Sequence, residues 1–203
     1  MNIDFIPKKD IPDGYIDPIC ASKQWETILD VVTKNDVQLD LFTIPFVTEK
    51  FCQELIKASE DYGKWTTDRH ERYPTYDMLI SSFGWWAVYD KMLKEYAFPV
   101  ANHYWQMNSK AETYKTTETF IVKYEYNGQQ TFLAPHIDTA SYTTTLTLND
   151  DFEGGGTYYT KHDILLKHKI GTLLFHPEIN YRHGARAISS GVRYVLITFH
   201  NHV

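Results

Sequence analysis

The chain has 203 residues, of which 43% are hydrophobic, and its formal net charge is -6. This length supports one substantial core, and nothing in the composition indicates a second. The acidic balance and the lack of a Lys/Arg block argue against nucleic-acid binding. The apolar runs are too short to span a bilayer, and the first residues do not resemble a secretory signal. Cys20 and Cys52 lie in no metal-binding or redox spacing, so we expect buried or free thiols, although a disulfide between them is left open.

Residues 1–38 are predicted to form an N-terminal arm with one short helix. Prolines interrupt the start of this segment, and apolar residues recur at helical spacing from Trp25 to Val32. Residues 39–203 are predicted to form one domain, which opens with a strand over residues 39–44. Pro45 ends that strand because proline has no backbone N–H to donate to a ladder.

Helices are predicted between residues 48 and 107. Thr48 is a suitable N-cap for a first helix, and Gly63 is a suitable C-cap. A second helical pattern runs over residues 83–107, where Pro99 is expected to produce a kink. Its aromatic stripe is most simply explained as part of the core.

From residue 118 the pattern changes to β-branched residues with a period of two. Short strands are predicted within 118–200, separated by turn residues, at 119–124, 142–148, 157–159, 172–175 and 193–199. Helices followed by antiparallel strands define an α+β fold. The expected architecture is a double-stranded β-helix, or jelly roll, with N-terminal supporting helices.

Four residues suggest a metal-dependent reaction. In a strand, residues i and i+2 point to the same side, so His136 and Asp138 can bind one ion, and His183 follows 45 residues later. Two imidazoles and a carboxylate on one face of Fe(II) leave three positions for a bidentate co-substrate and dioxygen. Arg193, ten residues beyond His183 in an apolar strand, could pair with a carboxylate of that co-substrate.

Each of these signals has a simpler explanation when it is taken alone. A His-X-Asp sequence is common by chance in a chain with nine histidines. Arg193 could form a buried ion pair with an aspartate or glutamate. A jelly-roll module that holds zinc through His136, Asp138 and His183 is a competing hypothesis, but a zinc site has no need of Arg193.

The chain resembles the 2-oxoglutarate- and Fe(II)-dependent oxygenases of the prolyl and lysyl hydroxylase group, and the procollagen lysyl hydroxylases in particular. The resemblance extends from about residue 41 to the end of the chain. The matching residues are 62–65, Pro74, Thr75, Asp77, 97–100, 122–124, 130–138, Tyr142, Thr143, Leu148, Asn149, 151–156, Gly171, His176, Pro177, His183 and 191–199.

The resemblance implies an enzyme that hydroxylates C5 of peptidyl lysine in collagen-like Gly-X-Lys sequences and converts 2-oxoglutarate to succinate and CO2. Its implied cofactors are Fe(II), bound by residues matching His136, Asp138 and His183, with 2-oxoglutarate as co-substrate and ascorbate as reductant. Arg193 would bind the far carboxylate of 2-oxoglutarate, and Tyr124 could donate a hydroxyl hydrogen bond to it. Thr143, Thr145 and Thr147 share one strand face and could line the pocket.

The same resemblance implies a homodimer and a collagen-like protein substrate, and it suggests the C-terminal domain of a longer protein. Its divergence is typical of a distant member, such as a domain of a giant-virus collagen-modifying enzyme. The family location would be the endoplasmic reticulum lumen or, for a viral protein, the infected host cell. Peptidyl prolyl hydroxylation by the same fold stays open, although such enzymes often carry lysine at the position of Arg193.

Several residues near these motifs are expected to be structural. Family members carry Glu-Gly after the distal histidine, whereas Gly184 and Ala185 follow His183 here, so we expect the substrate-facing loop to differ. Asn149 and the glycines at 154–156 are expected to shape a bulged strand entry. His176 is expected to pack at a strand end, and a role behind the metal ligands is left open.

Overall fold

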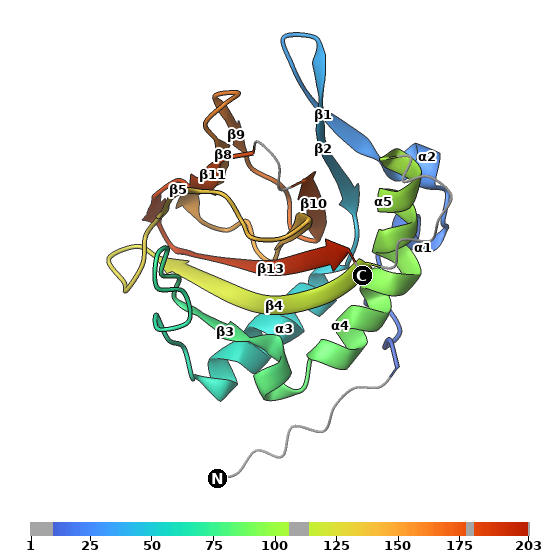
Figure 1. Cartoon of the computed structure of the whole chain (residues 1–203). Coiled ribbons are helices and arrows are strands. Elements are labelled where there is room, and N and C mark those ends of the chain that lie inside the picture. The colour runs from blue at the N-terminus through green and yellow to red at the C-terminus, as the bar shows by residue number, and fades with distance from the viewer. Residues whose placement is uncertain (1–9, 106–113, 178–180, 203) are drawn as a thin grey trace.

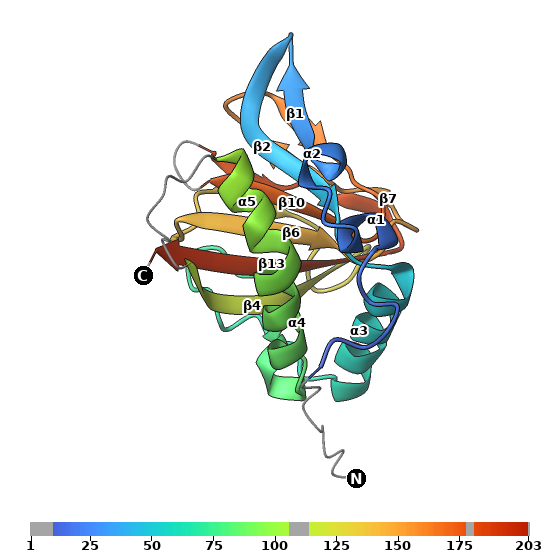
Figure 2. The ribbon, with the colours of Figure 1, turned by 90° about the vertical axis from the view of Figure 1, so that its right-hand side faces the viewer.

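The computed structural model describes residues 10–105, 114–177 and 181–202, which form an α+β fold (Figure 1). Two antiparallel sheets face each other, and a layer of helices covers the outer side of the larger sheet (Figure 2). No helix in these ranges is long and apolar enough to cross a membrane. The predicted jelly-roll architecture with supporting helices is confirmed.

The N-terminal segment packs onto the body of the domain. It contains two short helices, α1 (Pro18–Ala21) and α2 (Trp25–Ile28), and the hairpin strands β1 (Asp30–Lys34) and β2 (Val37–Pro45). The helix predicted to continue to Val32 ends at Ile28 because the β-branched residues that follow pair with β2. This hairpin lies across the expected boundary at residue 38 and attaches the N-terminal segment to the large sheet.

Helix α3 (Glu49–Tyr62) has the ends that its sequence predicts. The Thr48 hydroxyl accepts a hydrogen bond from the Phe51 amide, and Gly63 closes the helix with φ of 65°. Phe51, Cys52 and Leu55 form its buried face. Cys20 and Cys52 are both buried free thiols, as expected.

The second helical region is divided into four pieces. A 3-10 turn, η1 (Ile80–Phe83), is followed by α4 (Trp86–Met92), a π-helical turn η2 (Leu93–Ala97) and α5 (Phe98–Tyr104). Pro99 lies in the first turn of α5, where no intrahelical N–H donor is required. The predicted end of this region at residue 107 lies outside the described residues.

The large sheet has seven strands in the order β1-β2-β10-β6-β13-β4-β3. Strand β3 (Asp77–Leu79) falls within the range expected to be helical and forms the edge beside β4. Four strands of this sheet agree with the predicted period-two segments. They are β4 (Tyr114–Glu125), β6 (Tyr142–Thr147), β10 (Thr172–Pro177) and β13 (Val192–His202).

The small sheet has four strands in the order β5-β11-β8-β9. They are β5 (Leu133–His136), β8 (Thr157–Tyr159), β9 (Ile164–Leu166) and β11 (His183–Ala185). A further pair, β7 (Glu153–Gly154) and β12 (Ile188–Ser190), forms a separate two-stranded sheet.

Alternation along β4 and β13 separates two of the three hydrophobic clusters of the described residues. Ile121 and Leu196 point toward the helices and pack with Phe51, Leu55 and Met92 in the main cluster. Their strand neighbours on the opposite face form a second cluster that lies between the sheets. This cluster contains Phe120, Val122, Tyr124, Ala185, Ile188 and Val195. The period of two therefore delivers side chains of β4 and β13 into the space between the two sheets.

Candidate metal and co-substrate site

His136, Asp138 and His183 come together at one end of the space between the sheets. His136 ends β5, Asp138 follows two residues later, and His183 begins β11 directly opposite His136. His136 Nε2 lies 3.1 Å from Asp138 Oδ1, and His183 Nε2 lies 3.6 Å from Asp138 Oδ2. One ligand atom from each residue lies within 4.8 Å of the others, as one metal ion requires.

Backbone carbonyls orient both imidazoles. His136 Nδ1 lies 3.0 Å from the carbonyl oxygen of Ala134, and His183 Nδ1 lies 2.9 Å from that of Tyr181. A carbonyl only accepts, so each Nδ1 carries a proton and each Nε2 faces the cluster, where it can bind a metal ion once it is deprotonated. This is the arrangement that metal-binding histidines adopt.

The protonation states of the three groups depend on burial and on their mutual contacts. Burial lowers the pKa of His183. Burial also lowers the pKa of His136, but its hydrogen bonds to Asp138 and to the Ala134 carbonyl outweigh this effect and raise it above 6.5. Burial alone would raise the pKa of Asp138, whereas the hydrogen bond from His136 holds it well below its usual range. The site therefore keeps an anionic carboxylate ready for a cation.

Arg193 is buried in the same space without an acidic partner. It is 5% exposed, its Nη2 lies 3.4 Å from the Thr157 hydroxyl, and its guanidinium lies 5.4 Å from the centre of the Tyr124 ring. No described aspartate or glutamate forms an ion pair with it, so the structure does not support the alternative of a buried ion pair. Burial lowers the pKa of Arg193, but a guanidinium stays charged at physiological pH.

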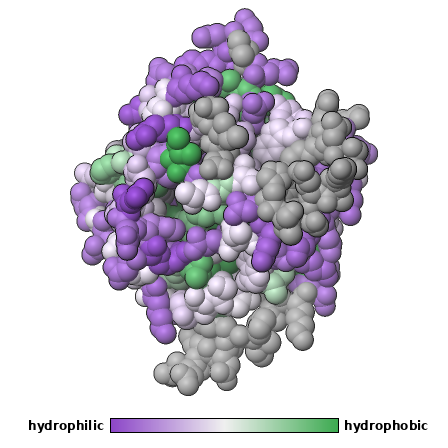
Figure 3. Space-filling view, viewed as in Figure 1, coloured by the Kyte–Doolittle hydropathy of each residue, from purple (hydrophilic) through white to green (hydrophobic). Residues whose placement is uncertain are grey.

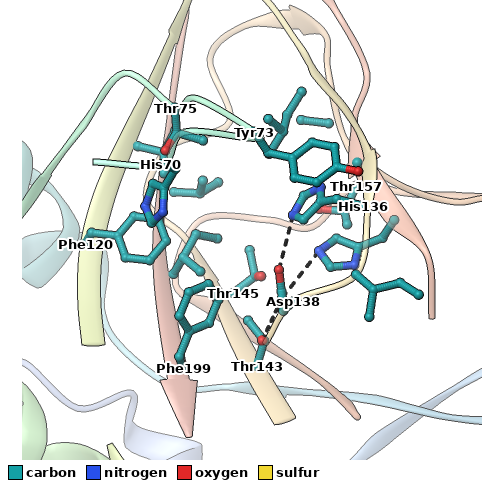
Figure 4. A pocket seen from close by; sticks show the side chains of 18 of the residues that line it. His70, Tyr73, Thr75, Phe120, His136, Asp138, Thr143, Thr145, Thr157 and Phe199 are labelled. Atoms are coloured by element: carbon teal, nitrogen blue, oxygen red, sulfur yellow. Dashed lines mark hydrogen bonds and ion pairs between the residues drawn. The ribbon is translucent and has the colours of Figure 1, made fainter. Parts of the chain in front are cut away.

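A cavity of about 460 Å³ connects the metal ligands with Arg193. Its opening appears in Figure 3 as a hollow with apolar atoms, bordered by hydrophilic side chains. Figure 4 shows His136 and Asp138 at one end and Phe120, His70 and Phe199 at the other. The cavity thus has a polar end that can bind an ion and a diacid, and an apolar end beside it.

The loop over residues 66–76 forms one wall of this cavity. The Tyr73 ring lies 5.0 Å from the ring of His136, at the mouth. Arg69 forms ion pairs with Asp77 on β3 and Glu118 on β4, which anchors the loop to the large sheet. None of these contacts has a signal in the sequence, since a loop has no periodicity.

The threonines divide between the cavity and its surroundings. Thr143 and Thr145 line it, whereas Thr147, farther along β6, is buried outside the lining. Thr143 also donates a hydrogen bond of 2.7 Å to Asp138 Oδ2, a contact that its predicted position on the strand face did not reveal. Thr157, which the sequence did not single out, contacts Arg193. Tyr124 lines the cavity beneath the Arg193 guanidinium.

Several neighbouring residues have the structural roles expected of them. Asn149 bridges the backbone of Val192 and Tyr194 through its side-chain amide. The glycines at 154–156 all have positive φ, and a Cβ on Gly155 would meet Phe152 at 2.8 Å. Asp150 and Asp151 line a separate depression beside α3, so they do not face the metal ligands.

Comparisons with known proteins agree with this geometry. No protein-family model matches the chain. It is 28% identical over 175 residues to the multifunctional procollagen lysine hydroxylase and glycosyltransferase LH3 of Rattus norvegicus, covering 79% of this chain and 23% of that protein. It is also 28% identical over 180 residues to the procollagen lysyl hydroxylase and glycosyltransferase of Acanthamoeba polyphaga mimivirus, covering 80% and 19%. The chain thus spans about a quarter or less of these relatives.

Solved structures share the fold. The viral collagen prolyl hydroxylase of Paramecium Bursaria Chlorella virus-1, in complex with 2OG, superposes with a TM-score of 0.61 at 16% identity, covering 80% of this chain and 96% of that one. A prolyl-4-hydroxylase of Pseudomonas putida gives a TM-score of 0.52 at 11% identity, covering 76% and 85%. At such identities these likenesses establish the fold alone.

Together, the fold, the His-Asp-His cluster and the sequence similarity match those of a 2-oxoglutarate-dependent, non-haem iron dioxygenase domain. Within this class the chain is homologous to a region of the procollagen lysyl hydroxylases. Its own residues fit both cofactors. The inward-facing Nε2 atoms and an anionic carboxylate suit Fe(II), and the unpaired buried Arg193 suits a carboxylate of 2-oxoglutarate.

Proposed function

We propose that this domain hydroxylates C5 of peptidyl lysine in collagen-like sequences and releases succinate and CO2 from 2-oxoglutarate. The observation that carries the proposal is the position of Arg193. A buried guanidinium without an acidic partner opens into the same cavity as three metal-ligand side chains. Burying such a charge is costly unless an anion pairs with it. A dicarboxylate can pair with the guanidinium through one carboxylate and reach the metal ion with the other.

Each residue of the site has a defined part in this proposal. His136, Asp138 and His183 hold Fe(II), which, when bound together with 2-oxoglutarate, supplies the activation of dioxygen. Arg193 binds the far carboxylate, and Thr157 and Tyr124 fix its guanidinium from two sides. Thr145 lines the intervening space. The apolar walls at Val122, Val195 and Ile197 exclude water from the reacting groups.

The choice of lysine is supported by the names of the sequence relatives, which are procollagen lysine hydroxylases. The apolar end of the cavity, around Phe120 and Phe199, suits the aliphatic stem of a long side chain. Ascorbate as reductant, a homodimeric assembly and a collagen-like protein substrate belong to the same proposal.

Peptide hydroxylation tests the proposal directly. Purified protein with Fe(II), 2-oxoglutarate and ascorbate is assayed for succinate with collagen-like peptides that carry either lysine or proline in the Y position. We expect succinate release and a 16 Da mass increase, the mass of one oxygen atom, on the lysine peptide alone. His136→Ala and Arg193→Ala should lose this activity, whereas His103→Ala on α5, whose side chain lies outside the cavity lining, should keep it.

Two other outcomes would redirect the proposal. Hydroxylation of proline but not lysine would favour the prolyl alternative, for which the fold neighbour from the chlorella virus is a precedent. Retained zinc with no 2-oxoglutarate turnover would favour a non-oxygenase metal-binding module. Equal activity of the His136→Ala variant would contradict the assignment of the site.

A further inference from the structure

A fourth histidine, His176 on β10, lies behind the metal ligands. Its Nε2 is 4.0 Å from Asp138 Oδ2, and its ring centre is 4.5 Å from that of His183. The side chain is 1% exposed and is not part of the cavity lining. It therefore cannot touch a substrate in the cavity, but it borders two of the three ligands.

Neither ring nitrogen of His176 has a hydrogen-bond partner among the described residues. The hydroxyl of Tyr159, whose ring centre lies 5.8 Å away, is likewise buried and without a described partner. Leaving a buried polar group unsatisfied is costly, and replacing it with an apolar one of similar shape would remove that cost. An imidazole in this position therefore requires an explanation other than packing.

The register of the sheet places His176 beside a second hydrogen-bonding group. His176 on β10 is paired directly with Thr143 on β6, and Thr143 donates to Asp138 Oδ2. Directly paired side chains on one sheet face lie within contact distance. Asp138 Oδ2 thus faces Thr143, His176 and the metal ligand His183, while Oδ1 faces His136.

We propose that His176 is a positioning residue of the metal site, whose Nε2–H acts with the Thr143 hydroxyl to fix the orientation of the Asp138 carboxylate. The inference rests on the proposed metal site. With Oδ2 fixed in this way, rotation of the carboxylate is prevented, and the three ligands are preorganised for one ion. A small movement from 4.0 Å closes the hydrogen bond.

Substitutions at His176 separate this role from simple packing. His176→Phe keeps a planar ring of similar size and removes both nitrogens. His176→Gln places an amide donor near the position of Nε2, whereas His176→Asn places it near Nδ1. If the hydrogen bond from Nε2–H to Asp138 positions the carboxylate, only the glutamine variant should keep the metal affinity of the wild type.

The measurement is the affinity of the metal-free full chain for Mn(II), by titration calorimetry, together with its thermal unfolding without metal. We expect His176→Phe and His176→Asn to bind Mn(II) about 10–100-fold more weakly, with His176→Gln close to the wild type. Thr143→Val should weaken binding similarly, and Thr143→Ser should not. His200→Phe is the matched control, because His200 is a buried histidine of the same sheet that hydrogen-bonds Thr144 and Thr116 instead.

The outcomes distinguish this inference from the function on which it rests. Unchanged Mn(II) affinity in His176→Phe, or equal weakening in the glutamine and asparagine variants, would overturn the role of His176 while leaving the metal site intact. Failure of the wild type to bind Mn(II) would overturn the metal site itself. Should the phenylalanine variant not fold, the comparison of glutamine with asparagine, and of valine with serine at Thr143, decides the question.

Discussion

Arg193 combines a cost in stability with a gain in binding. Its charge is buried against Thr157 and Tyr124 rather than against an acid, so the empty protein carries an uncompensated cation between its sheets. In proteins this arrangement is destabilising until an anion arrives. The same residue should therefore move stability and co-substrate binding in opposite directions when it is replaced.

Arg193→Met provides this test at the level of one residue. We expect the variant to be more stable without ligands, by about 1–3 kcal/mol in the free energy of urea unfolding, because a buried charge is replaced by an apolar chain. We also expect the KM for 2-oxoglutarate to rise at least about thirtyfold, since loss of a buried charge pair costs about 2 kcal/mol or more. Arg186→Met, outside the cavity lining, should leave the KM unchanged. A less stable Arg193→Met protein would show that the charge is compensated.

His136 makes metal binding dependent on pH. Its pKa in the metal-free protein lies above 6.5 because of its bonds to Asp138 and Ala134, and a metal ligand must be deprotonated. Affinity should therefore rise with pH through a window above 6.5 and then level off, by up to about tenfold per pH unit for one released proton. Calorimetry of Mn(II) binding in two buffers of different ionisation enthalpy measures the number of protons released on binding. An affinity that is flat from pH 6 to 8 would contradict the assignment.

At the scale of elements, a close backbone contact joins the end of β2 to the start of β10, because the Phe46 and Val47 amides donate to the Gly171 carbonyl. Gly171, which precedes β10, has φ of 80°, and a Cβ there would meet the Val47 carbonyl oxygen at 2.1 Å. Gly14 has a similar φ of 76°, but the nearest atom to its Cβ would be Lys50 Cδ at 4.0 Å. A side chain at Gly14 would therefore meet only the cost of a positive φ, whereas one at Gly171 would also collide with the Val47 backbone.

Alanine at these two positions should give different losses. Gly14→Ala is expected to lower the free energy of unfolding by about 1 kcal/mol through its positive φ alone. Gly171→Ala should lose about 2–3 kcal/mol more, because the backbone of residue 47 must move. Urea unfolding of both variants measures the difference. Equal losses of unfolding free energy in the two variants would mean that the backbone between β2 and β10 can shift at little cost.

Elements whose signals are local could be predicted from the sequence, and contacts between distant strands could not. Helix α3 was predicted with both ends because Thr48 and Gly63 act within one turn. The segment after Ile28 was wrongly expected to stay helical, since its pairing with β2 is a tertiary contact. Likewise the spacing and the family resemblance together predicted the four main site residues, whereas the Thr157–Arg193 and Thr143–Asp138 bonds depend on how separate strands meet.

At the scale of the whole molecule, burial of neutral histidines makes the fold sensitive to acid. Burial lowers the pKa of both His200 and His176 to about 3, whereas the unfolded chain titrates near 6.5. Below pH 6.5 the unfolded state binds more protons, so stability falls as the pH falls from 6.5 toward 3. His136 has the opposite effect on stability, because its raised pKa means that the folded state binds its proton more tightly than the unfolded state does.

His200→Gln should reduce this acid sensitivity. The variant removes one of the buried titrating groups, so its unfolding free energy should fall less steeply between pH 6.5 and 5, by up to about 1.4 kcal/mol per pH unit. Urea unfolding of the metal-free proteins at several pH values checks the slope. Identical slopes for variant and wild type would show that His200 does not stay neutral in the folded state.

The central claim is that one cavity binds Fe(II) through His136, Asp138 and His183 and 2-oxoglutarate through Arg193. Its most direct test is an anaerobic titration of the Fe(II)-loaded protein with 2-oxoglutarate, followed by visible absorption. The account predicts a weak charge-transfer band with the wild type, no band with His136→Ala, and a half-saturation shifted to higher 2-oxoglutarate with Arg193→Met. A wild-type protein that shows no band and retains zinc would contradict it.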